Sequence, residues 1–154
     1  MQKQRLCYVL DGDNLRHGIN RDLGFTHEDR TENIRRTAEI ARLMNDAGLI
    51  VIASLISPLV ADRAMAQAII GAERFVEVYL NTPLEVCEAR DPKNLYIKAR
   101  QGLITHFTGV SAPYEAPPAA DICIDTQSVC PQEAAQQILA TIKNRVQVPR
   151  LNGD

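Results

Sequence analysis

Two carboxylates follow directly on the first apolar run of the chain. The run LCYVL, at residues 6–10, leads into DGDN, which places Asp11 and Asp13 two positions apart. Asp, Gly and Asn are common turn formers, so one interpretation is that this segment is only a turn. A turn rarely needs two acids at this place, however, and side chains at the carboxyl end of a buried strand are well placed to contact a ligand. We therefore treat Asp11 and Asp13 as candidate functional residues.

A cationic side chain further along the chain indicates an anionic ligand. Thr26 is a predicted N-cap of a helix that extends to about residue 47 and stops at Gly48. At 100° per residue, Arg30 and Asn33 fall on the side of the apolar stripe, which consists of Ile34, Ala38, Ala41 and Met44. An inward guanidinium is costly unless it meets an anion, and a helix start favours anions. The alternatives are an anionic ligand at Arg30 and Asn33, or an internal salt bridge from Arg30 to Asp22.

An aromatic side chain lies just before this helix. Phe25 precedes the predicted cap, where a hydrophobic staple would pair it with the fourth helical residue. That residue is Arg30, which is a poor staple partner. The ring of Phe25 is therefore free to face a planar ligand.

Strand and helix patterns alternate along the whole chain. Apolar, β-branched runs predict buried strands at 6–10, 49–56, 75–80 and 121–125. Helices are predicted at 26–47, 59–70, from 82 onward with Thr82 as cap, at 93–101 and at 131–146, with a Gly/Pro-rich loop at 102–119. This alternation predicts an α/β fold with a mostly parallel sheet, in which ligands bind beyond the carboxyl ends of the strands.

Composition narrows the class of protein. The 154 residues, 45% hydrophobic and 23% charged, are typical of a single globular domain, which we place at 1–154. A net charge of −2 gives no reason to expect binding to a nucleic acid polymer or to a membrane surface. The sequence shows no signal peptide and no apolar run of membrane-spanning length. The four cysteines form no CxxC pair, which favours reduced thiols and a cytoplasmic location.

Five segments together carry a resemblance to a known family. They are LDGDNLRHGINRDLGF, DRTENIRR, DAGLIVIASLISP, EVYLNTPLEVCEARDPKNLYIKAR and HFTGVSAPYEAP. In this order they resemble the adenylyl-sulfate kinase (APS kinase) family, from about residue 8 to about residue 126. The resemblance implies a P-loop-kinase-like three-layer α/β/α fold. It also implies transfer of the γ-phosphoryl group of ATP, bound with Mg²⁺, to the 3′-hydroxyl of adenylyl sulfate.

The resemblance also implies roles for individual residues. Asp13 would be the candidate general base at the 3′-hydroxyl, and Asp11 would order the Mg²⁺ shell or the Asp13 loop, with no direct metal ligand among the protein side chains. Ser57 matches a serine described as phosphorylated in bacterial members, but a direct in-line transfer needs no such intermediate. We therefore treat Ser57 first as a pocket residue, or simply as a serine that starts a loop. The residues expected to bind the acceptor are Arg16, Phe25, Arg30, Asn33, Ile56, Lys93, Leu95 and Phe107, with Phe25 and Phe107 on either side of the adenine.

A lid is implied at about 90–110. Its cations Arg90, Lys98 and Arg100 would close over the ATP phosphates together with Lys93, although each of these could equally be an exposed surface charge. Two positions depart from the family pattern. Asn94 stands where the family usually has Gly, and Ile97 stands where it usually has Lys, so lid flexibility and charge are expected to differ.

The largest departure concerns the nucleotide. No G-x-x-x-x-G-K-[ST] motif, which cradles the phosphates of ATP, occurs anywhere in the chain. Relative to the family, the first strand, the P-loop and the first helix are missing, so an exposed apolar groove or an added partner strand is expected in the sheet. Three accounts stand open: an incomplete sequence, a natural chain completed by another polypeptide, or a relative that binds adenylyl sulfate without catalysis. The resemblance further implies a homodimer and fusion to, or association with, ATP sulfurylase.

Overall fold

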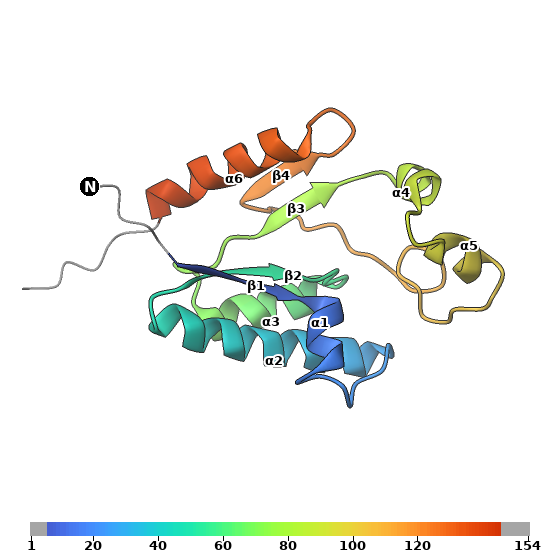
Figure 1. The fold of residues 1–154 in the computed structure, drawn as a ribbon, viewed down its shortest axis with the longest axis horizontal. Coiled ribbons are helices and arrows are strands. Elements are labelled where there is room, and N and C mark those ends of the chain that lie inside the picture. Colours follow the sequence, from blue (N-terminus) through green and yellow to red (C-terminus); the bar gives the residue numbers. More distant parts are fainter. Residues whose placement is uncertain (1–5, 146–154) are drawn as a thin grey trace, which may run out of the picture.

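The computed structural model describes residues 6–145, and its strands alternate with helices as predicted (Figure 1). The strands are β1 (Cys7–Asp11), β2 (Ile50–Ser54), β3 (Val78–Asn81) and β4 (Ile122–Asp125). The helices are α1 (Gly12–His17), α2 (His27–Asp46), α3 (Val60–Ile70), α4 (Leu84–Arg90), α5 (Leu95–Arg100) and α6 (Pro131–Arg145). The predicted end of the last helix, at residue 146, lies outside the described residues.

The long helix α2 forms for the reasons that its sequence suggests. The Thr26 hydroxyl accepts a hydrogen bond from the Asp29 amide at 3.2 Å, which satisfies one of the free amides of the first turn. The predicted stripe faces inward, with Ile34, Ala38 and Ala41 buried and Met44 half-buried. This stripe packs against α3, where Ile34 and Ala38 form one core cluster with its residues.

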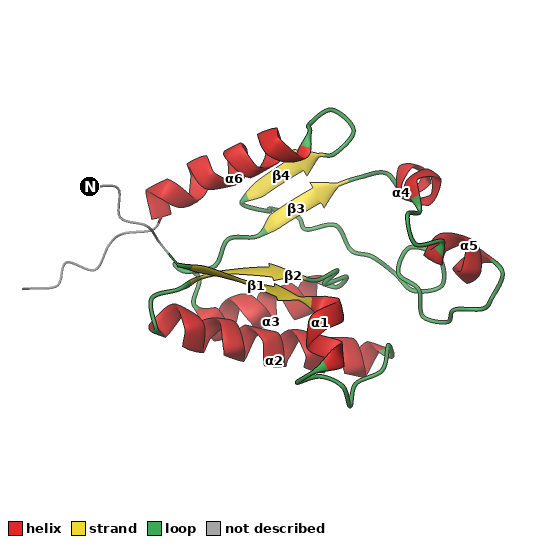
Figure 2. Ribbon diagram, in the orientation of Figure 1, coloured by secondary structure: helices red, strands yellow, loops and turns green. Residues whose placement is uncertain are grey.

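The four strands are parallel, as predicted, but they form two separate pairs. β1 pairs with β2 from Cys7↔Ile50 to Asp11↔Ser54, and β3 pairs with β4 from Val78↔Ile122 to Asn81↔Asp125. α2 and α3 cover one side of the first pair, and α6 lies along the second pair (Figure 2). Within residues 6–145 no described strand bridges β2 and β3 by hydrogen bonds, so the parallel strands are interrupted, and an interruption of the sheet is what the resemblance led us to expect.

Apolar strand residues are exposed as a result. Tyr8, Val9, Ile52 and Leu80 are each between 50% and 58% exposed, although their strands read as buried in the sequence. Continuous apolar strands are typical of parallel sheets covered on both faces. The strand residues 6–10, 49–56 and 75–80 thus have the composition of a core, and in the described structure only part of their surface is covered.

The structure differs from the local predictions at DGDN and at Thr82. DGDN is not only a turn, because it begins helix α1, and the Asp11 carboxylate caps it by accepting from the amides of Asp13 and Asn14. Thr82 is not the cap of α4, which begins at Leu84 with Pro83 before it. The Thr82 hydroxyl instead hydrogen-bonds the hydroxyl of Thr126 beside β4 at 2.5 Å. None of the helices described in residues 6–145 is long and apolar enough to span a membrane.

Candidate acceptor pocket

A cavity of about 210 Å³ lies at the carboxyl ends of β1 and β2. All four strands run toward the same side of the molecule, where α1, α4 and α5 also lie (Figure 2). Three segments line the cavity: the β1–α1 junction, the start of α2 with Phe25 before it, and residues 54–58 after β2. Eight predicted site residues meet there, namely Asp11, Asp13, Arg16, Phe25, Arg30, Asn33, Ile56 and Ser57.

The two carboxylates at the pocket have different surroundings. Asp11 is committed in part to the backbone, since its Oδ1 accepts from the Asp13 amide at 3.0 Å and from the Asn14 amide at 3.2 Å. Asp13 is exposed, and its Oδ2 accepts from Nζ of Lys93 at 3.0 Å. The hydrogen bond from Lys93 to Asp13 raises the pKa of the lysine. Asp11 therefore fixes the loop, and Asp13 presents its carboxylate to the pocket and to the lysine.

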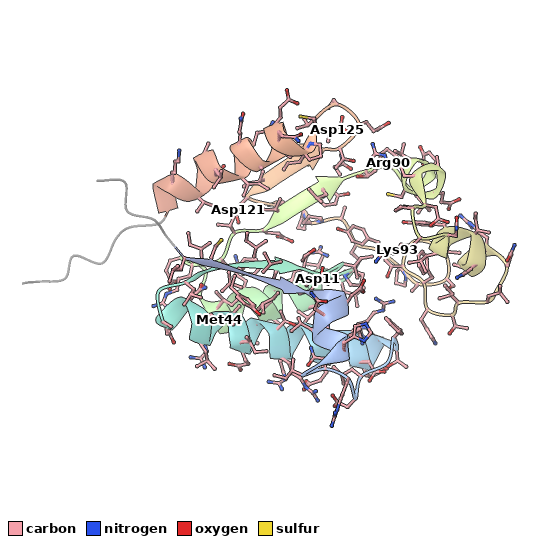
Figure 3. The ribbon with its side chains drawn as sticks, viewed as in Figure 1. Asp11, Met44, Arg90, Lys93, Asp121 and Asp125 are labelled. Atoms are coloured by element: carbon pink, nitrogen blue, oxygen red, sulfur yellow. The ribbon has the colours of Figure 1, made fainter. Side chains whose placement is uncertain are left out.

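Lys93 reaches this site from the segment between α4 and α5. Figure 3 shows Lys93 on a segment that returns toward the end of β1, where Asp11 lies. Both Lys93 and Asp13 are largely exposed, so the ion pair contributes little to stability. The ion pair matters because of its position: it joins Lys93 of the expected lid to Asp13, the candidate base.

Two arginines lie close to the ring of Phe25. The guanidinium carbon of Arg16 lies 4.5 Å from the ring centroid, and that of Arg30 lies 5.6 Å from it. Arg16 donates to the carbonyls of Leu23 and Gly24, at 3.1 and 2.5 Å. Cations near an aromatic face are attracted by its quadrupole, so these contacts place two positive charges against the half-exposed ring.

Arg30 is the inward cation that the helical wheel predicted. Its Nε donates to the carbonyl of Phe25 at 3.2 Å, and its Nη2 donates to the carbonyl of His106 at 2.9 Å. Burial lowers the pKa of Arg30, and the nearby positive charge of Arg16 lowers it further. Both effects oppose the positive charge, so the pair Arg16 and Arg30 favours an anion between them.

The predicted alternative for Arg30, a salt bridge to Asp22, was wrong. Asp22 pairs with Arg36 at 2.8 Å, and the hydrogen bond from Arg36 lowers the pKa of the aspartate. Asn33 lines the pocket but is buried, and its Oδ1 accepts from Nδ2 of Asn20 at 2.8 Å. Asn20 is fully buried and ties the loop after α1 to α2, a role that no periodic pattern in the sequence could reveal.

The remaining predicted residues lie outside the cavity lining. Phe107 makes an edge-to-face contact with Tyr96, with ring centroids 5.0 Å apart, and its neighbour His106 is the residue that Arg30 holds. Leu95 begins α5 and is partly exposed. The structure thus brings Phe107 near the pocket through Arg30, and it does not show Phe107 facing Phe25.

The cations of the expected lid have mixed surroundings. Arg90 donates to the hydroxyl and to the carbonyl of Thr126, at 3.1 and 2.9 Å, and lies beside Asp125 (Figure 3). Arg100 pairs with Glu88 at 2.5 Å, and Lys98 is exposed. Asn94 has φ of +55°, a left-handed conformation that asparagine tolerates better than most residues.

A divalent ion has limited protein ligands here. Among residues 6–145 no group of three or more His, Cys, Asp or Glu side chains could hold a metal by itself. Mg²⁺ bound to a nucleotide usually needs only one or two carboxylates, with phosphate oxygens and water completing its shell. Asp11 and Asp13 fit that lesser role, and an ion near Asp13 would compete with Lys93 for the same carboxylate.

Comparison with known proteins gives a consistent result. The family model described as adenylylsulphate kinase matches residues 1–125. The adenylyl-sulfate kinase of Shewanella baltica (strain OS185) is 52% identical over 147 residues, which are 96% of this chain and 70% of that protein. The bifunctional enzyme NodQ of Rhizobium tropici is 54% identical over 140 residues, which are 91% of this chain and 22% of that protein.

A solved structure agrees with the sequence matches. The APS kinase CysC of Mycobacterium tuberculosis, solved in complex with AMPPNP and APS, superposes with a TM-score of 0.86 and 46% sequence identity. The match covers 90% of this chain and 81% of that one. The parallel α/β fold, the pocket at the strand ends and these matches together show that the chain belongs to the adenylylsulphate kinase family.

Proposed function

We propose that the pocket binds adenylyl sulfate and that the complete catalytic unit transfers the γ-phosphoryl group of ATP to its 3′-hydroxyl. The products are 3′-phosphoadenylyl sulfate and ADP. The main support for the proposal is that one cavity is lined by Asp13, Arg16, Phe25 and Arg30, which come from separate segments of the chain. A carboxylate, two cations and an aromatic ring are the groups that a hydroxyl, a phosphosulfate and an adenine require.

Positioning and charge neutralisation account for most of the catalysis of phosphoryl transfer. Asp13 is proposed to accept the proton of the 3′-hydroxyl as the phosphoryl group is transferred. Its backbone is fixed by the Asp11 carboxylate, which supports the assignment of Asp11 to ordering the Asp13 loop. Lys93 would leave Asp13 for the anionic end of a substrate, since an exposed ion pair costs little to break.

The acceptor is proposed to lie with its adenine against Phe25 and its phosphosulfate between Arg16 and Arg30. Both guanidinium groups donate hydrogen bonds to backbone carbonyls, so they are held in place before a ligand binds. Phe107 is proposed to close on the other face of the adenine when the segment around it moves with Arg30. Ser57 is proposed as a wall of the pocket and not as a phosphorylated intermediate.

The ATP side of the reaction has no P-loop within the 154 residues. Mg²⁺, when bound with ATP, supplies neutralisation of phosphate charge, and Asp11 and Asp13 are the residues that would hold its shell. Lys98 and Arg100 are proposed to approach the phosphates from the lid, although Arg100 would first have to leave Glu88. These cations do not replace the backbone amides with which a P-loop holds the phosphates of ATP. We therefore propose that the 154 residues alone do not phosphorylate adenylyl sulfate.

A second function has an observation in its favour. The acceptor residues are all present, whereas the G-x-x-x-x-G-K-[ST] motif is not. This combination suits a relative that binds adenylyl sulfate without phosphorylating it. Self-association as a homodimer, a link to an ATP sulfurylase and a cytoplasmic location stay predictions. The relative NodQ is named a bifunctional enzyme, which supports fusion to a second enzyme without identifying it.

One assay separates the two functions. Purified protein, free of host kinase, is incubated with ATP, Mg²⁺ and adenylyl sulfate, and 3′-phosphoadenylyl sulfate is quantified, while binding of adenylyl sulfate is measured in parallel by calorimetry. The 154-residue chain is expected to bind adenylyl sulfate and form no product, whereas a chain extended through a P-loop segment of a relative is expected to form product. Binding without product in both proteins would favour the non-catalytic function, and no binding in either would refute both.

A further inference from the structure

Outside the pocket lining, one nearly buried arginine contacts three separate segments. Only 10% of the Arg63 side chain, on α3, is exposed. Its Nε lies 2.7 Å from a carboxylate oxygen of Glu77, just before β3. Its Nη1 donates to the carbonyl of Ser57 and its Nη2 donates to the carbonyl of Glu115, each at 2.7 Å. One planar guanidinium therefore joins the loop after β2, the loop before β4 and the approach to β3.

The Ser57 end of this network is a wall of the acceptor pocket. Residues 54–58 line the cavity, and within them Ser57 has φ of +39°. A left-handed conformation is unfavourable for a residue with a Cβ atom, and it persists only where surrounding contacts hold it. The hydrogen bond from Arg63 to the Ser57 carbonyl is such a contact.

Glu115 fastens the same wall from the other side. Its amide donates to the carbonyl of Pro58 at 2.8 Å, and its carboxylate accepts from the amide of Val60 at 2.8 Å. The Arg63 guanidinium also lies 6.0 Å from the ring centroid of Tyr114. Loop 111–116 and residues 57–60 are thus attached to each other, and Arg63 contacts both.

We propose that Arg63 is a positioning residue that holds the Ser54–Pro58 wall in the shape that admits adenylyl sulfate. The inference rests on the proposed function and adds a residue that does not itself line the pocket. The planar fork of arginine reaches the carboxylate and both carbonyls at once, whereas a lysine ammonium is a single point that cannot span them. Replacement of Arg63 by lysine therefore keeps the positive charge but loses the contacts that position the Ser54–Pro58 wall.

The test uses R63K, with R63Q measured in parallel and T31V as a control. Thr31 on α2 hydrogen-bonds Asp62 on α3 at 2.9 Å, so T31V destabilises the same helix without touching the wall. Three quantities are measured for each protein: the Tm, the Kd for adenylyl sulfate by calorimetry well below the Tm, and hydrogen exchange of amides in 55–60 and 111–116.

R63K and R63Q are expected to raise the Kd about tenfold, the scale of one lost charge-assisted hydrogen bond, and to speed exchange in both segments together. T31V is expected to lower the Tm and leave both readouts near wild type. An unchanged Kd in R63K, or equal effects in T31V, would overturn the inference. If the wild-type protein binds no adenylyl sulfate, the proposed function fails, and the exchange data alone decide whether Arg63 holds the wall.

Discussion

Replacing Arg30 with alanine separates the phosphosulfate contact from the other contacts of this side chain. In the structure the guanidinium makes two hydrogen bonds, to the carbonyls of Phe25 and His106, and lies over the Phe25 ring. AMP keeps the phosphate but lacks the sulfate, so its binding senses the positions of Phe25 and the His106 loop and not a contact from Arg30 to the sulfate. Adenylyl sulfate senses these positions and, by our proposal, an additional charge-assisted contact.

The magnitudes follow from these contacts. Loss of the two partly exposed backbone contacts is expected to weaken AMP binding by about 1 kcal/mol, or roughly fivefold. Loss of the contact to the sulfate adds about 2 kcal/mol, so the affinity for adenylyl sulfate is expected to fall roughly a hundredfold or more. The difference between the two ligands, about 2 kcal/mol, is the quantity that measures the proposed contact.

Titration calorimetry with both ligands measures this difference. Arg35→Ala is the matched control, because Arg35 lies on the same helix, is 45% exposed and pairs with Glu32 on the outer face. Arg35→Ala is expected to leave both affinities unchanged. Equal losses for AMP and adenylyl sulfate in Arg30→Ala would refute the assignment of Arg30 to the phosphosulfate end.

Three further predictions follow from the site and from α2. In a chain extended through a P-loop, Asp13→Asn is expected to lower kcat by about 100-fold or more and to leave the Kd for adenylyl sulfate nearly unchanged, whereas a parallel change in both would remove Asp13 from the role of base. The hydrogen bonds from Arg35 and Arg36 lower the pKa of Glu32 from 4.5 to about 2, so this carboxylate stabilises the fold above about pH 4.5 and the contribution is lost as the pH falls toward 2. Tm measured against pH is therefore expected to fall less steeply over that range in Arg36→Met, and an unaltered slope would contradict this. Thr26→Ala, which removes the cap of α2, is expected to lower the free energy of unfolding by about 1 kcal/mol in chemical denaturation, with Thr141→Ala on α6 as the control that loses no cap.

The elements were predictable because their patterns are local. The strand at 6–10, the Thr26 cap and the stripe of α2 each follow from neighbouring residues. The structure confirms the cap, the stripe and the strand, but not the burial that was predicted for most of that strand. The inward position of Arg30 followed from helical periodicity alone. The resemblance to the family then predicted which of these side chains meet at one pocket.

The contacts that join distant segments were not predictable from local patterns. Asn20 and Arg63 are polar residues whose partners lie elsewhere in the chain, and nothing in their neighbours signals burial. Asp11 was predicted to serve a ligand, and the structure shows that it also caps α1, because a short helix of six residues gives little periodic signal. The separation of the strands into two pairs is different, because the resemblance to the family led us to expect an interruption in the sheet.

The central claim is that adenylyl sulfate occupies the pocket with its 3′-hydroxyl at Asp13. A crystal structure of the protein with adenylyl sulfate tests it most directly. The account predicts the adenine against Phe25, the phosphosulfate between Arg16 and Arg30, and the 3′-hydroxyl within hydrogen-bonding distance of Asp13, with Lys93 displaced from that carboxylate. A ligand bound with its 3′-hydroxyl away from Asp13, or with its phosphosulfate away from both arginines, would contradict the account.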